Sequence, residues 1–286
     1  MSQKHKGILC IITSALFFAL MSLFVRLSGD LPVIQKSFFR NLVALVFASA
    51  VLLRARPSIQ LNFGDWGGLI LRSLFGTVGV LCNFYAVDHL LLADATILNK
   101  LSPFFAILMA ALILGERLKF FQIGAVLMAF FGAMLVIKPG TGLMTTPALI
   151  GLFGGFAAGT AYTMVRFLGK RGVPGPFVVF FFSAFSCITH GPLVFLNMAP
   201  MNDLQLMYLL LAGLCAAIAQ FAVTAAYFYA PAREISVFDY SQILFSALLG
   251  FIIFDQMPDA YSWLGYAVIL ITAIANFIYN NRYEEA

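Results

Sequence analysis

Long apolar segments follow one another along this whole chain and limit what it can fold into. Ten of them are long enough to cross the hydrocarbon core of a bilayer, which is about 30 Å thick and needs roughly 20 residues per helix. Proline and glycine stand between most of these segments, where a helix would end. The pattern predicts an all-α, polytopic membrane protein with ten transmembrane helices. Their approximate limits are 7–28, 33–53, 66–87, 92–114, 121–138, 148–168, 176–196, 205–228, 234–254 and 262–280.

Composition excludes the main soluble classes. Only 10% of the 286 residues are charged, against about a quarter in a soluble domain, and the mean hydropathy is +0.96. A soluble enzyme or a nucleic-acid-binding protein is therefore excluded. The sequence contains no phosphate-binding loop, no HExxH run and no GxSxG run, so it predicts neither catalysis nor a bound cofactor. The four cysteines lie singly inside apolar runs, so no metal site is indicated either.

The basic residues predict how the chain lies in the membrane. Lys and Arg concentrate in the loops of one side, whereas the opposite side holds only Lys138 and, near its edge, Lys36. Because such residues are enriched in cytoplasmic loops, both termini are predicted to be cytoplasmic, with the chain in the plasma (inner) membrane. The residues on the predicted cytoplasmic side are Lys4, Lys6, Arg54, Arg56, Arg117, Lys119, Lys170, Arg171, Arg233 and Arg282.

The second half of the chain repeats the first. Residues 93–116 match residues 232–255 at an offset of 139 positions, and Val25-Arg26-Leu27 matches Val165-Arg166-Phe167 at an offset of 140. The predicted repeats are residues 1–140 and residues 141–286, each with five helices. Because five is odd, the second repeat enters the membrane in the opposite orientation. Two inverted repeats are typical of carriers that work by alternating access.

Four motifs make the resemblance to a known family specific. They are Phe38-Phe39-Arg40-Asn41, Leu71-Arg72, the run from Ala93 to Ser102-Pro103 with Gly115-Glu116, and Phe254-Asp255-Gln256-Met257-Pro258. The chain resembles the drug/metabolite transporter superfamily, with two EamA-type domains over nearly its whole length. Within it, the chain is most similar to the branch of S-adenosylmethionine and organic-anion carriers. Ser73 stands where that branch usually has glycine, a change between small residues.

Ionisable residues inside the apolar runs are the candidate functional residues, since an unpaired charge at bilayer depth is costly. Counting about 1.5 Å per residue from the helix ends predicts two tiers. The outer tier would hold Arg40, Lys100, Asn83 and Asn99, and the inner tier would hold Arg72, Asp239, Gln220 and Thr224. Lys100 and Asp239 occupy equivalent repeat positions, but this count separates them by roughly 10 Å in depth. Arg72 is therefore the predicted partner of Asp239.

Helical spacing predicts that polar side chains share a cavity. Arg72, Gly76, Gly79 and Asn83 lie on one helical face, and the same holds for residues 220, 224 and 227 and for residues 239, 242 and 246. The resemblance implies that segments 66–87, 92–114, 205–228 and 234–254 line a central cavity. The candidate substrate-binding residues are Arg40, Arg72, Asn83, Asn99, Lys100, Tyr162, Gln220, Thr224, Tyr227, Asp239, Tyr240 and Gln242. A purely structural role, bridging helices or reaching the interface, stays open for each of them.

The buried basic residues outnumber Asp239, which favours an anionic or zwitterionic substrate. We therefore expect a secondary active transporter of a small polar metabolite such as an amino acid, a carboxylate or a nucleotide-like cofactor. Asp239 is the candidate proton-coupling group. The expected partners are this substrate, membrane lipid and a coupled proton or exchanged metabolite, with the chain a monomer and no nucleic acid involved. The alternatives are a broad exporter of aromatic or lipophilic compounds and, more remotely, a channel or a scaffold.

Overall fold

The computed structural model describes residues 3–55, 57, 59, 61–115, 119–138, 145–229 and 236–283. Within these residues the regular structure is helical throughout, and ten stretches are long and apolar enough to cross a membrane. The helices are α1 (Gln3–Leu27), α2 (Val33–Ala55), α3 (Phe63–His89), α4 (Leu92–Asn99), α5 (Ser102–Leu114), α6 (Phe120–Ile137), α7 (Thr145–Lys170), α8 (Gly175–Leu196), α9 (Asp203–Tyr229), the 3₁₀ helix η1 (Ser236–Tyr240), α11 (Ser241–Phe254) and α12 (Ala260–Tyr283).

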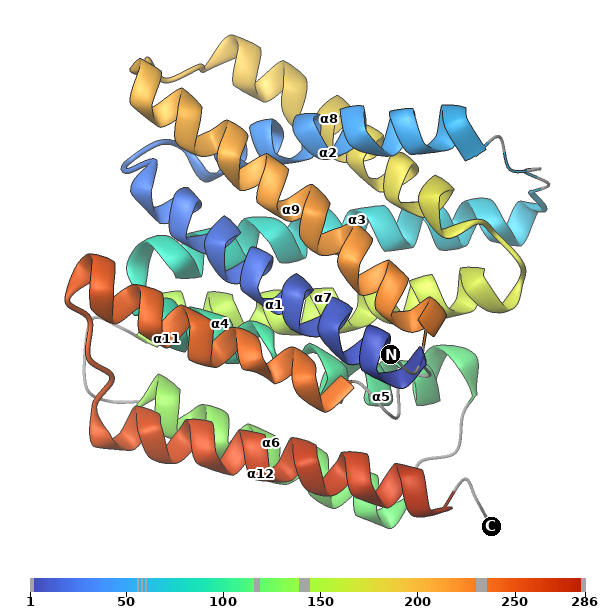
Figure 1. Cartoon of the computed structure of the whole chain (residues 1–286), viewed down its shortest axis with the longest axis vertical. Coiled ribbons are helices and arrows are strands. Elements are labelled where there is room, and N and C mark those ends of the chain that lie inside the picture. Colours follow the sequence, from blue (N-terminus) through green and yellow to red (C-terminus); the bar gives the residue numbers. More distant parts are fainter. Residues whose placement is uncertain are drawn as a thin grey trace.

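The two halves of the chain interlock instead of forming separate bundles. α1 packs on α9, α2 on α8, α3 on α7 and α6 on α12, so each of these four pairs takes one helix from each half. Figure 1 shows α2 and α8 at one edge and α6 and α12 at the other, and between these edges α1 and α9 cross in front of α3 and α7. The first residues of α1 and the last of α12 lie at the same side of the bundle (Figure 1). The prediction of an all-α membrane protein built from two inverted repeats is confirmed.

One predicted helix is broken in the structure. Residues 92–114 form α4 and α5, which a turn at Lys100 and Leu101 separates, although the backbone angles of Leu101 stay in the α region. Pro103, in the first turn of α5, explains the break because it has no N–H to offer the Asn99 carbonyl and its ring collides with that carbonyl. The matching segment of the second repeat is also irregular, since η1 precedes α11 there.

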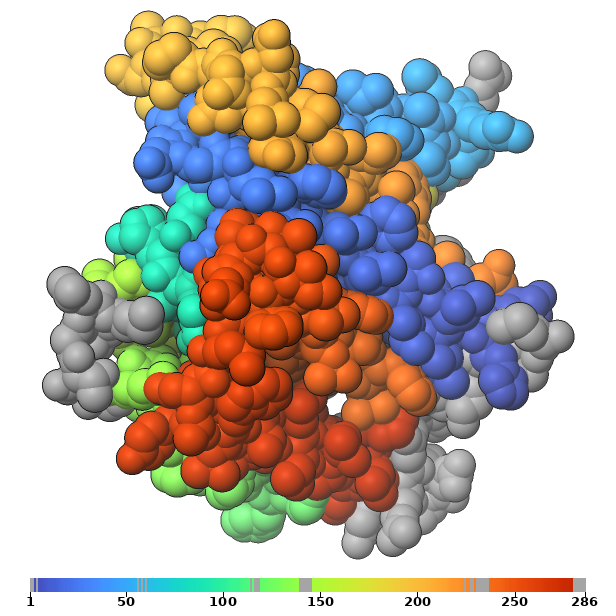
Figure 2. Space-filling view, turned by 60° about the vertical axis from the view of Figure 1, so that its left-hand side comes forward, coloured from blue at the N-terminus to red at the C-terminus, as the bar shows by residue number. Residues whose placement is uncertain are grey.

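α4 and α11 run antiparallel and close against each other. The Leu92 backbone N–H donates to Gln256 Oε1 at 3.0 Å, and Thr96 Oγ1 donates to Ser246 Oγ at 2.8 Å. The residue nearer the start of α4 thus contacts the residue just after the end of α11, and the later residue of α4 contacts an earlier residue of α11. α11 also lies beside α1, as Figure 2 shows from the face formed by the last part of the chain.

Glycines of α7 allow it to lie directly against the break between α4 and α5. A Cβ atom at Gly155 would come 2.5 Å from the Leu98 carbonyl oxygen, and one at Gly159 would come 2.5 Å from the Ser102 carbonyl oxygen. Gly151 faces the Leu98 side chain. The spacing of four residues between these glycines thus serves close helix packing.

Replacing Gly155 with alanine should therefore destabilise the fold. The added methyl group would push α7 away from Leu98, and overpacking of this kind costs about 1–3 kcal/mol. Gly124→Ala in α6 is the matched control, because nothing lies within 4 Å of a Cβ atom there. The midpoint of thermal unfolding in detergent should fall for Gly155→Ala and hold or rise for Gly124→Ala. Equal midpoints for the two variants would contradict the packing described.

Candidate functional site

An ion pair joins the two irregular segments near the centre of the bundle. Lys100 Nζ lies 2.6 Å from Asp239 Oδ2, and both side chains are largely buried. Lys100 is the C-terminal capping residue of α4, where the helix dipole favours a positive charge. Asp239 lies in η1, just before the N-terminus of α11, where the dipole favours a negative charge. Each charge therefore lies at a helix end and next to its partner.

This pair corrects the prediction that Arg72 is the partner of Asp239. The depth count assumed straight helices of known length, running perpendicular to the membrane. In the structure the fourth span is broken at Lys100, and the ninth enters through a 3₁₀ turn that contains Asp239. Residues in equivalent positions of inverted repeats meet only at the pseudo-twofold axis, and Lys100 and Asp239 lie there. The separation of Lys100 and Asp239 into different tiers is therefore wrong.

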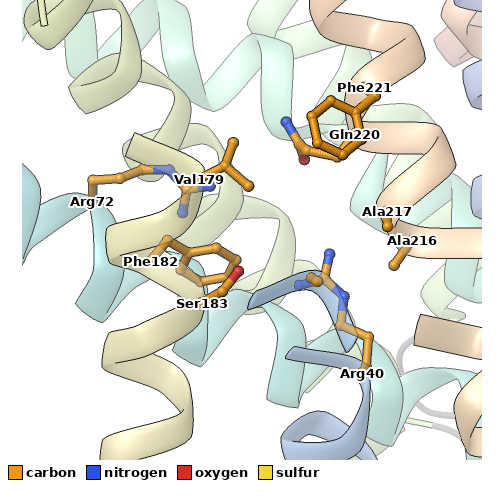
Figure 3. Close-up of a pocket in the computed structure, with 10 residues that line it drawn as sticks. Arg40, Arg72, Val179, Phe182, Ser183, Ala216, Ala217, Gln220 and Phe221 are labelled. Atoms are coloured by element: carbon orange, nitrogen blue, oxygen red, sulfur yellow. The ribbon is translucent and has the colours of Figure 1, made fainter. Parts of the chain in front are cut away.

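A second polar cluster forms a pocket between α2, α3, α8 and α9. Arg40, Arg72 and Gln220 extend toward the same space from three different helices, beside Phe182 and Ser183 (Figure 3). The free space is about 10 Å³, room for about one water molecule, so a larger ligand requires the walls to part. The remaining lining residues are small or apolar: Ala44, Val179, Ala216, Ala217 and Phe221.

The two arginines of this pocket are buried without an acidic partner. Each is 7% exposed, and the Nε atom of each has no hydrogen-bond partner within the described part of the chain. Arg40 Nη1 donates to Asn41 Oδ1 at 2.7 Å. Both guanidinium groups lie over the ring of Phe182, at 4.2 Å from its centroid for Arg72 and 5.8 Å for Arg40. The described chain thus holds two positive charges here that no carboxylate neutralises.

Gly76 makes room for one of these arginines. It follows Arg72 by one helical turn, and a Cβ atom at Gly76 would overlap the Arg72 guanidinium and come 2.9 Å from the Phe182 ring. Helical spacing grouped Gly76 with Gly79 and Asn83 on the same face. The structure divides that face, because Gly79 and the backbone of Asn83 pack against α7 at Ala158 and Gly154.

Tyr162 of α7 connects the two clusters. Its side chain is close enough to Arg40, Arg72 and Asp239 to interact electrostatically with all three. The Tyr162 side chain is 52% exposed, although α7 is packed on α3, α4 and α5. An aromatic side chain with a hydroxyl group therefore stands between the ion pair and the arginine pocket.

The other candidates lie in varied surroundings. Tyr240 is 7% exposed in the apolar core, and Gln242 is 8% exposed on α11. Asn83 and Asn99 are half-buried and do not line the arginine pocket. The side chains of Thr224 and Tyr227 lie outside the described part of the structure. No group of three metal-ligating side chains occurs among the residues that were described.

Sequence reasoning missed Phe182 and Ser183, the residues that α8 contributes to the pocket. Phe182 stands in a row of phenylalanines and carries no signal of its own. The repeat offset does carry one, because Arg40 on α2 corresponds to Val179 on α8, and Val179 begins the stretch of α8 that lines the pocket. Symmetry between the halves thus points to this stretch.

Ten spans in two inverted repeats, with charged side chains buried at their centre, define a membrane transporter of the drug/metabolite class. A sequence model of the EamA-like transporter family matches residues 5–138 and again residues 145–278. The chain therefore belongs to the EamA-like transporter family. The resemblance seen in the motifs is confirmed at this level, and the carrier branch within the superfamily stays a prediction.

Relatives that match over nearly the whole chain are named as transporters of small molecules. A pseudopaline exporter of Pseudomonas aeruginosa is 30% identical over 94% of this chain and 95% of its own length. A riboflavin transporter of Rhizobium johnstonii is 27% identical over 98% and 93%, and one of Vibrio cholerae is 26% identical over 95% and 94%. A crystal structure with a TM-score of 0.67 covers 97% of this chain and 98% of its own, and at 18% identity it shows the fold alone.

Exchanging the charges of Lys100 and Asp239 should distinguish this ion pair from the predicted pair of Arg72 and Asp239. Lys100→Asp places two carboxylates together and should lower the unfolding midpoint, whereas Lys100→Asp with Asp239→Lys should recover it. The expected coupling free energy in this cycle is about 1–3 kcal/mol. Arg72→Asp with Asp239→Arg is the control and should show no recovery. Recovery in the control cycle alone would restore the rejected pairing.

Proposed function

We propose that this protein is a secondary active carrier that moves a small organic anion or zwitterion across the inner membrane by alternating access. The observation that carries the proposal is the pocket in which Arg40 and Arg72 are buried without an acidic partner. Both arginines lie inside apolar helices that are long enough to span the bilayer. A guanidinium group binds carboxylate or phosphate through two parallel hydrogen bonds, so this pair suits an acidic substrate.

Alternating access is supported by the way the pocket is assembled. Arg40 and Arg72 belong to the first repeat, and Phe182, Ser183 and Gln220 belong to the second. Rocking of one repeat against the other would open the pocket to one side of the membrane and then to the other. The basic loops favour cytoplasmic termini for this arrangement. The relatives named as a pseudopaline exporter and riboflavin transporters support a small organic substrate.

Counterflow in proteoliposomes tests this function. Vesicles loaded with pooled unlabelled metabolites should take up labelled anions or zwitterions of one class. Arg72→Gln should reduce that uptake roughly ten- to a hundredfold, because a hydrogen bond to a charged group is worth about 1.5–3 kcal/mol. Arg54→Gln is the matched control: it removes a positive charge at the exposed end of α2 and should leave the uptake unchanged.

Other results would favour other functions. Exchange of many unrelated aromatic compounds, insensitive to Arg72→Gln, would support the exporter of lipophilic compounds. Flux without saturation and without counterflow would point to a channel. Folded protein that exchanges nothing would contradict a carrier altogether.

Asp239 is the group through which we expect a proton to drive transport. Its carboxylate holds Lys100 at 2.6 Å, and Tyr162 and Tyr240 are near enough to interact with it electrostatically. Protonation of Asp239 would break the ion pair and release α4 from η1. Coupling of this kind requires a carboxyl group that water and protons can reach. The Asp239 side chain meets this requirement, since 26% of it is exposed.

Replacing Asp239 with asparagine should therefore remove proton drive and keep exchange. The amide keeps the shape of the carboxyl group but does not titrate. Uptake driven by a pH gradient should disappear, while counterflow at equal pH persists. Uptake by Asp239→Asn that still follows the imposed gradient would eliminate Asp239 as the coupling group.

A further inference from the structure

The charges around the pocket do not balance, and the imbalance specifies the ligand more closely. Lys100 and Asp239 neutralise each other at 2.6 Å. Arg40 and Arg72 have no such partner, and they are close enough to repel each other electrostatically. Among these four ionisable side chains, the surplus is two positive charges, and both are in the pocket.

The surroundings of the arginines stabilise these charges only in part. A cation over an aromatic ring gains about 0.5–2 kcal/mol, but the Phe182 ring accepts none of the N–H groups in a conventional hydrogen bond. Moving an unpaired ion out of water costs several kcal/mol. The Nε atoms of Arg40 and Arg72 and the Oγ atom of Ser183 have no hydrogen-bond partner in the described structure. Three buried polar groups therefore remain available to a ligand.

The pocket offers no negative charge to a positively charged group. Its lining residues include no carboxylate, and the nearby carboxylate of Asp239 is bound to Lys100. An amino acid could place its carboxylate at one arginine, but its ammonium group would lie beside the other. A monoanion would leave one guanidinium uncompensated. Two negative charges on one ligand match both arginines.

We propose that the pocket selects a dianion: an organic molecule that carries two carboxylates or one doubly charged phosphate and contacts Arg40 and Arg72 together. This proposal rests on the proposed carrier function and narrows its substrate class. Ser183, 1% exposed with an unpartnered hydroxyl group, supplies a further hydrogen bond to the bound acid. Gly76 keeps the Arg72 guanidinium free to reach it.

Binding of matched acids to purified protein tests the selection. Calorimetry in detergent compares succinate with its monoamide, and glycerol phosphate with its methyl ester, so that one negative charge differs within each pair. Glutamate is added as a molecule that has both carboxylates and an ammonium group. In at least one pair, we expect the dianion to bind at least tenfold more tightly than its monoanion, and glutamate to bind weakly. The pair that responds identifies whether carboxylates or phosphate are preferred.

Single substitutions then test whether the two arginines cause the selection. Arg40→Gln should reduce the ratio of dianion to monoanion affinity toward one, chiefly by weakening the dianion. Arg40→Lys keeps the positive charge and should retain part of the ratio. It is the control for misfolding of Arg40→Gln, and gel filtration checks the folding of both variants. Arg54→Gln should leave the ratio unchanged. A merely structural role of Arg40 would lower both affinities alike.

Failure of this inference can be separated from failure of the carrier function. If monoanions or glutamate bind as tightly as the dianions while counterflow remains intact, the pocket does not distinguish ligands by their charge. This result would contradict the dianion proposal and leave the carrier function standing. If counterflow is absent for every acid tested, the carrier function falls and the inference falls with it. A ratio that Arg40→Gln leaves unchanged would also overturn the proposal.

Discussion

The ion pair between Lys100 and Asp239 is the constraint on which the centre of this structure depends. A broken helix inside a membrane exposes polar backbone groups, which must be satisfied within the protein. Here the broken fourth span and the irregular start of the ninth meet, each with a charge that suits its helix end. Because the two residues are equivalent in the two repeats, one contact fixes both breaks near the pseudo-twofold axis. The glycines of α7 then close over the break from the other side.

That pairing decides which charges remain for a ligand. If Asp239 bound Arg72, Lys100 and Arg40 would be the surplus charges, and only Arg40 of these two lines the pocket. With Asp239 bound to Lys100, the surplus is concentrated at Arg40 and Arg72, on either side of one aromatic residue. The neutral pair thus serves the architecture and the proposed coupling, whereas the arginine pair serves the proposed binding. Tyr162 is placed where it interacts with both.

The sequence predicted the features that depend on residue pattern, the spans and the repeats. It did not predict the contacts that depend on how the helices tilt and bend. Segment length and hydropathy predicted the spans, and the offset of 139 residues predicted the repeats. The same offset showed that Lys100 and Asp239 are equivalent, but a count of residues along straight helices separated them. The effect of Pro103 was readable in principle, since proline disfavours the helix just before it. Phe182 could not be identified as a partner of Arg40 and Arg72, because a phenylalanine facing lipid and one facing a guanidinium look alike in a sequence.

The charge surplus also bears on how such a carrier would cycle. Closing the walls around Arg40 and Arg72 removes both guanidinium groups from water, which is costly unless an anion enters with them. A bound dianion lowers that cost more in the closed form than in an open form, where water already screens the arginines. A ligand shifts a conformational equilibrium by its difference in affinity for the two forms. In the proposed mechanism, the loaded protein therefore passes through the closed form more readily than the unloaded protein. This difference favours exchange of one acid for another over net movement, and a proton at Asp239 becomes the means by which the unloaded protein returns.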